Sequence, residues 1–174
     1  MSEDQKRSSK IRGPIFIRLN RQFHASKSVF IGPLPHLNMG LKMKIWLLRS
    51  FRHAAWAPLS VFAFYAIVAK GFNAYLIYPW LDMPTHFFGG MAITYFYLIT
   101  ASYSQVFIEP IPRIIQLILP LSLTTVTAVV WEFWEYLSDV ILGTKMNLGV
   151  SDTLSDLFFG LFGACFLMAV LRKS

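Results

Sequence analysis

Cysteine and charge are both scarce in this sequence. Cys165 is the only cysteine among the 174 residues, which excludes a disulfide bond within the chain. Only 14% of the residues are charged, whereas soluble domains carry about 25%. Hydrophobic residues make up 55% of the chain. This composition is typical of an integral membrane protein and argues against a soluble domain.

Basic residues are rare after the first third of the chain. Eleven of the sixteen Lys and Arg residues lie at or before Arg52. We therefore expect residues 1–52 to form a basic, partly disordered cytoplasmic extension. Because it leads directly into an apolar run, anionic lipid explains this charge better than nucleic acid does. No nucleic-acid partner is expected.

Four apolar segments predict helices that cross a membrane: about 54–69, 82–107, 114–142 and 152–171. The sequence thus predicts an all-α fold, a four-helix bundle spanning the membrane in residues 53–174. Lys and Arg residues concentrate in the N-terminal flank, the loop at Arg113 and the C-terminal tail. By the positive-inside rule, both termini are expected to be cytoplasmic, in a multi-pass protein of the inner membrane.

Seven polar side chains gather in the outer half of these predicted spans: Asp82, His86, Glu132, Glu135, Asp139, Asp152 and Asp156. Six of the seven acidic residues after Asp4 belong to this group. In a helix, Glu132 and Glu135 share one face. Carboxylates at membrane depth are costly, so they indicate a functional site.

Glycine follows the acidic residues at a regular spacing in two segments. Residues 82–90 and 152–160 match weakly, with Asp, Thr or Ser, Phe and Gly at equivalent positions. Both segments carry a polar face at i+4 spacing that runs into Gly90 and Gly160. Because small residues let membrane helices approach closely, we expect these faces to point into the bundle.

The acidic group needs compensating charge, because several carboxylates cannot all be ionised in an apolar slab. Lys70 and Lys145, the bases expected on that side, lie in loops. A divalent metal (Zn, Mn, Fe or Mg) is one solution. Protons shared along a transporter relay are the other. The sequence contains no HExxH, ExxH or CxxC motif to decide between them.

The metal hypothesis assigns a role to each member of the group. The expected ligands or acid–base groups are His86, Glu132, Glu135 and Asp156, with catalysis by Glu132 and Glu135. Three further residues would orient ligands or complete the metal site: Asp82, Asp139 and Asp152.

Ordinary structural roles stay open beside these. Asp82 and Asp152 would serve as helix N-caps, and Asp139 would pair with Lys145. Tryptophan and tyrosine side chains would pack or form an interfacial belt. Interior hydrogen bonding would account for the remaining members: His86, Glu132, Glu135 and Asp156.

Three motifs in residues 54–171 carry a family resemblance. They are Asp82-x3-His86-Phe-Phe-x-Gly, Trp131-Glu132-x2-Glu135-x3-Asp139 and Ser151-Asp152-Thr153-x2-Asp156. Together they resemble the YjdF-type bacterial inner-membrane proteins and, more distantly, the VanZ-like group. The resemblance implies a helical protein of four or five spans and unestablished biochemistry, with VanZ-like members linked to the cell envelope and glycopeptide resistance. The chain departs from the VanZ-like pattern because it lacks the Gln usual near Glu135.

Three functions therefore stay open. The first is a metal site that acts on an envelope lipid or a lipid-linked substrate. The second is a small proton- or cation-coupled transporter, which would form a homo-oligomer because four helices enclose little pore. The third is a non-catalytic assembly subunit. Membrane lipid is the expected partner in each case.

Overall fold

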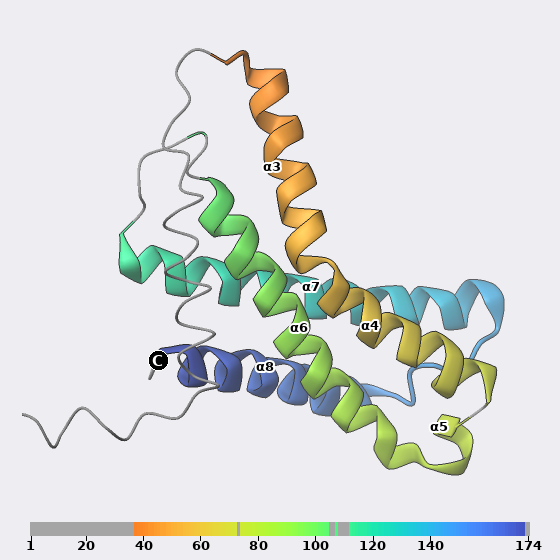
Figure 1. Ribbon diagram of the computed structural model, residues 1–174. Helices are drawn as coiled ribbons and strands as arrows, with labels where there is room; N and C mark the ends of the chain where they lie inside the picture. The colour runs from red at the N-terminus through yellow and green to blue at the C-terminus, as the bar shows by residue number, and fades with distance from the viewer. Residues whose placement is uncertain (1–36, 73, 105–106, 108–111, 173–174) are drawn as a thin grey trace, which may run out of the picture.

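The computed structural model describes residues 37–72, 74–104, 107 and 112–172 (Figure 1). The described ranges form helices and contain no strand. The main helices are α3 (Met39–Ala54), α4 (Trp56–Phe64), α6 (Asp82–Tyr103), α7 (Arg113–Leu142) and α8 (Val150–Arg172). Three short helical segments link α4 to α6: Tyr65–Gly71, α5 (Ala74–Ile77) and Pro79–Leu81. Most of the predicted basic extension, residues 1–36, and the loop at 108–111 lie outside the described residues.

Two described helices are long and apolar enough to cross a membrane, Ile114–Leu142 and Val150–Leu171. They agree with the predicted third and fourth spans. The pair Met39–Ala54 and Trp56–Val68, bent by 50°, is a candidate for a third. α6 has 22 residues but does not reach the hydropathy of a span, because it carries polar residues such as Asp82 and His86. The four-span bundle with cytoplasmic termini therefore stays a prediction.

The first predicted span, 54–69, corresponds closely to Trp56–Val68, but it is the second part of a longer, bent helical region. The helical region begins at Met39, where the Asn38 side chain accepts a hydrogen bond from the Leu41 N–H at 2.8 Å. The chain bends between α3 and α4, close to Pro58. Proline lacks the N–H that would otherwise bond to the carbonyl four residues earlier, and this absence accounts for the bend.

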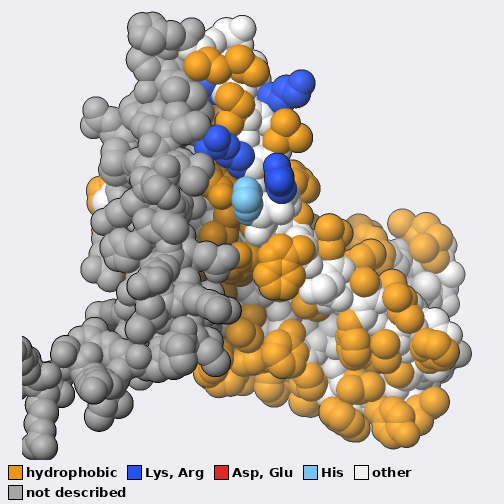
Figure 2. All heavy atoms as spheres, viewed as in Figure 1, with side chains coloured by type: hydrophobic (Ala, Val, Ile, Leu, Met, Phe, Trp, Pro, Cys, Tyr) orange, Lys and Arg blue, Asp and Glu red, His pale blue; other side chains and the backbone are white. Residues whose placement is uncertain are grey.

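α3 packs against the second half of α6. The Trp46 indole N–H donates to the Thr100 carbonyl at 3.1 Å. The rings of Phe51 and Phe96 meet edge to face, with centroids 5.8 Å apart. Figure 2 shows that Lys and Arg side chains also gather on α3, whereas hydrophobic side chains cover the bundle below it. These charges explain why the sequence suggested an extension there. The predicted domain boundary at residue 52 lies inside this helix and remains untested.

α6 and α8 lie in close backbone contact, which agrees with the expectation that their glycine-bearing faces point into the bundle. A Cβ built on Gly163 would lie 1.9 Å from the Phe87 carbonyl oxygen. A Cβ on Gly90 would clash in the same way with the Gly160 backbone. Only glycine permits this approach, which brings the first turns of α6 beside those of α8.

α7 joins the bundle through hydroxyl groups. The side chains of Thr94 and Thr124, both fully buried, form a hydrogen bond of 2.9 Å between α6 and α7. α7 ends at Gly143, which has a left-handed φ of 67° and donates its N–H to the Asp139 carbonyl. Glycine is a common residue at this position because it adopts the left-handed conformation without a Cβ clash, and the turn directs the chain toward α8.

Candidate functional site

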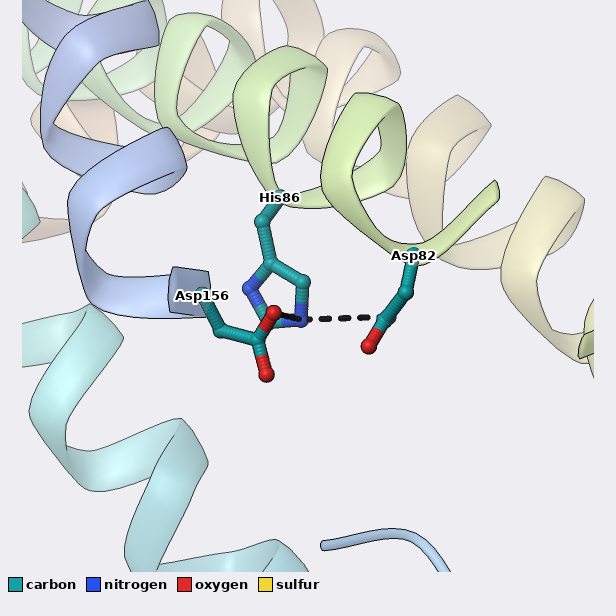
Figure 3. Close-up of side chains that lie close together, drawn as sticks. All are labelled: Asp82, His86 and Asp156. Atoms are coloured by element: carbon teal, nitrogen blue, oxygen red, sulfur yellow. Dashed lines mark ion pairs between the residues drawn. The ribbon is translucent and has the colours of Figure 1, made fainter. Parts of the chain in front are cut away.

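Three helices bring five of the seven predicted side chains together. Asp82 and His86 come from the first turns of α6, and Asp156 comes from α8 (Figure 3). Glu132 and Glu135 come from α7. The close approach of α6 and α8 makes this convergence possible. We call these five side chains the carboxylate–histidine cluster.

His86 lies between two carboxylates. Its Nε2 atom is 3.4 Å from Asp82 Oδ1 and 3.8 Å from Asp156 Oδ1 (Figure 3). One donor atom from each of these three residues lies within 4.8 Å of the others. Asp82 and His86 are one helical turn apart, so α6 alone sets their spacing. Asp156 joins this pair only because α8 packs against α6.

A second group of three shares Asp156 with the first. Glu132, Glu135 and Asp156 also offer donor atoms within 4.8 Å of one another. Their exposed fractions are only 7%, 5% and 2%, respectively. Among the described residues, neither Glu132 Oε2 nor Asp156 Oδ2 has a hydrogen-bond partner, although both atoms are buried. Buried, unpartnered carboxylate oxygens are costly, so these two atoms require a ligand or a proton.

Among the described residues, no Lys or Arg side chain forms an ion pair with the cluster. Within the described part of the chain, the only ion pairs that the cluster forms are those made by His86. Lys145 lines a cavity next to the cluster without forming an ion pair there. Four carboxylates thus face one imidazole in a buried place, an arrangement that attracts a cation.

Trp131 holds Glu135 in place. Its indole N–H donates to Glu135 Oε1 at 2.9 Å, one helical turn along α7. The Trp131 ring is itself packed edge to face against Tyr65, with centroids 5.6 Å apart. The sequence suggested only packing or a belt for the tryptophans. The i, i+4 spacing of Trp131 and Glu135 was the signal that could have revealed this bond.

Two cavities meet at the cluster. The first, about 300 Å³, is lined mainly by apolar groups of α4, α6 and α7 and reaches His86. The second, about 590 Å³, is lined by the α7–α8 loop and includes Lys145, Asp152 and Asp156. Four residues line both cavities: Tyr65, Tyr75, Asp82 and Glu135. Glu132 lines neither of them.

Tyr75 lies at this junction, a role that the sequence did not suggest; its place in an interfacial belt stays a prediction. It belongs to α5, which is outside the candidate spans. Burial raises the pKa of the Tyr75 phenol well above its ordinary value. The hydroxyl therefore stays protonated and can donate to a ligand in either cavity.

Asp139 and Asp152 lie outside the cluster and organise the α7–α8 loop. Asp139 accepts hydrogen bonds from the Thr144 hydroxyl and from the N–H groups of Met146 and Asn147. Asp152 accepts from the Leu148 N–H at 2.9 Å, as a residue inside the first turn of α8. Both residues thus have structural roles in the loop. Asp152 is not the N-cap that the sequence suggested, because α8 already begins at Val150. The expected pairing of Asp139 with Lys145 stays a prediction.

Asp82 is not the N-cap that the sequence suggested. The short helix Pro79–Leu81 runs directly into α6, so Asp82 already has helical dihedrals and Leu81 occupies the cap position. The Asp82 carboxylate is consequently available to His86.

Comparison with known proteins shows sequence similarity to one family and to a bacterial relative. The family described as "Predicted membrane protein (DUF2238)" matches residues 15–173. An uncharacterised protein of Thermotoga maritima is 32% identical over 113 residues, which cover 63% of this chain and 57% of the relative. The chain thus spans less than two thirds of that relative's length. No solved structure matches. The YjdF-type resemblance fits this family match, while the VanZ-like one stays a prediction.

Proposed function

The chain belongs to the DUF2238 family of predicted membrane proteins, and we propose that it binds a divalent metal and hydrolyses a phosphate bond of an envelope lipid or lipid-linked molecule. The observation that carries the proposal is the carboxylate–histidine cluster with its two buried, unpartnered oxygens. Oxygen-rich ligands with one imidazole suit Zn, Mn, Fe or Mg.

A metal accounts for the cluster better than structural hydrogen bonding does. Hydrogen-bonded carboxylates would find donors, yet Glu132 Oε2 and Asp156 Oδ2 find none among the described residues. A bound dication would lower the cost of burying such like charges. His86, Glu132, Glu135, Asp82 and Asp156 are the proposed ligands. Asp139 and Asp152 support the loop above them.

The two cavities favour an amphiphilic substrate. The first cavity is apolar except where it reaches the cluster, and its volume is within the range of known ligand sites. The second is more polar and contains Lys145, a cation suited to a phosphate group. A lipid whose chain enters the first cavity and whose phosphate faces the second would pass directly across the cluster.

Glu135 is the proposed general base: one of its two oxygens would bind the metal, and the other would take the proton. It lines both cavities, and Trp131 fixes one of its oxygens. A water molecule adds its oxygen to phosphorus and gives one proton to Glu135, while the bond from phosphorus to the leaving oxygen breaks. Glu135 then returns the proton to that oxygen. The metal would hold the phosphate and lower the pKa of the water. Glu132, which lines neither cavity, is proposed as a ligand.

The proposed topology places the cluster on the outer side of the inner membrane. Its support is the charge distribution, with fourteen of sixteen Lys and Arg residues on the segments assigned to the cytoplasm. Reporter fusions at the C-terminus, one active only in the cytoplasm and one only outside, test this. Activity of the outer reporter would refute a cytoplasmic C-terminus.

The activity is tested with purified protein in vesicles that contain a long-chain lipid phosphate or diphosphate. We expect phosphate release that a chelator stops and that added metal restores. Glu135→Gln should lower the rate about 100-fold or more, the usual contribution of a general base. Tyr136→Phe, which removes an exposed hydroxyl from the same helix turn, is the matched control. Release that is insensitive to both the chelator and Glu135→Gln would refute the proposal.

A further inference from the structure

We propose that the cluster holds two divalent metal ions bridged by Asp156, and that its substrate is a phosphoryl group lying across both ions. This inference rests on the proposed metal-dependent function and extends it. One ion would be held by Asp82, His86 and Asp156. The other would be held by Glu132, Glu135 and Asp156. Within each of these two groups, the donor atoms lie within 4.8 Å of one another.

Asp156 is suited to bridge two ions because it belongs to both groups. Its Oδ1 atom faces His86 Nε2 at 3.8 Å, and Figure 3 shows the side chain directed toward His86 and Asp82. Its Oδ2 atom is buried and has no hydrogen-bond partner among the described residues. One oxygen for each ion is the usual way in which a carboxylate joins a pair of metals.

The distances in the first group suit a metal ion. Ligand atoms about 2.1 Å from a tetrahedral ion lie about 3.4 Å from one another. His86 Nε2 is 3.4 Å from Asp82 Oδ1 and 3.8 Å from Asp156 Oδ1. A small movement of the Asp156 side chain would therefore complete this half of the site.

Charge also favours two ions over one. The cluster contains four carboxylates and one imidazole, which is neutral when it ligates a metal. Two dications balance the four negative charges, whereas one would leave two of them uncompensated in a buried place. The need for a second ion is clearest at Glu132, because its buried Oε2 has no hydrogen-bond partner among the described residues.

Two ions would also explain why the cluster lies between two cavities. Each ion would have three protein ligands, which leaves positions open for water and for the substrate. Metal pairs about 3.5–4 Å apart stabilise both the attacking and the leaving oxygen of a phosphoryl group. The substrate class is therefore a phosphate ester or anhydride, with water as the attacking group.

Manganese titration of the metal-stripped, full-length protein in detergent tests this proposal. We expect two equivalents to bind, with an electron paramagnetic resonance spectrum of two exchange-coupled ions. His86→Gln and Glu132→Gln should each leave about one equivalent without coupling. Asp156→Asn should abolish the coupling and leave at most one equivalent. Asp152→Asn makes the same change one turn earlier on α8 and should keep both ions.

Four results would overturn the proposal. One equivalent in the wild type would leave a single-metal site and its proposed activity intact. Two equivalents without coupling, or coupling that survives Asp156→Asn, would refute the bridging role of Asp156. No binding at all in folded protein would refute both this inference and the proposed metal-dependent function.

Discussion

Gly90 of α6 meets Gly160 of α8 so closely that a Cβ built on Gly90 would lie 1.9 Å from the Gly160 carbonyl oxygen. This contact is between two backbones, so no side chain can rotate away to relieve it. It lies one turn beyond His86 on α6 and one turn beyond Asp156 on α8. The contact therefore fixes the separation of two members of the carboxylate–histidine cluster.

Gly90→Ala should destabilise the protein, because the added methyl group forces α6 and α8 apart. Overpacking of this kind costs about 1–3 kcal/mol, and a clash with backbone should lie at the upper end. Thermal unfolding in detergent measures the effect. Gly89→Ala is the control, since a Cβ there meets only a Val61 methyl at 3.9 Å. Equal stability of the two variants would contradict the close packing.

Trp131→Phe should weaken metal binding while leaving the fold intact. The change keeps an aromatic ring but removes the indole N–H that holds Glu135 Oε1 at 2.9 Å. Loss of a group that orients a ligand usually lowers metal affinity about 10- to 100-fold. Competition with a chelating dye measures that affinity. Trp134→Phe, at a more exposed position on the same helix, should have little effect, and equal losses in both variants would count against the role of Trp131.

Asp139→Ala should loosen the α7–α8 loop without removing the metal. The carboxylate accepts from the Thr144 hydroxyl and from two backbone N–H groups, and each lost partner costs about 1 kcal/mol. We expect a lower unfolding temperature and faster amide exchange at Met146 and Asn147. Metal stoichiometry should not change. A variant of normal stability that lost its metal would place Asp139 in the site after all.

The inward direction of the polar faces of α6 and α8 was predictable, because short-range patterns in the sequence encode it. The spacing of Asp82, His86 and Gly90, repeated in residues 152–160, put polar and small residues on one face of each helix. Helix periodicity and the close approach of small residues were sufficient to predict this, but not the direct meeting of His86 and Asp156. The ends of α7 and α8 followed from the apolar runs and from Gly143 for similar reasons.

Features that depend on tertiary packing were not predictable. Lys and Arg residues made α3 look like a flexible flank, although Trp46 and Phe51 attach it to α6. The sequence also grouped Asp139 and Asp152 with the other carboxylates, because position along a helix does not reveal which N–H groups a loop will present. The first cavity lies between α4, α6 and α7, and the second borders the α7–α8 loop; no local pattern indicates either.

The most direct test of the proposed metal site is the metal content of the detergent-purified protein by mass spectrometry. Wild type should be measured beside Glu135→Ala and His86→Ala, one variant in each donor group. The proposal predicts that folded wild type retains at least one equivalent of one divalent metal and that both variants retain less. A folded wild type without bound metal, or with a content that neither variant lowers, would contradict it.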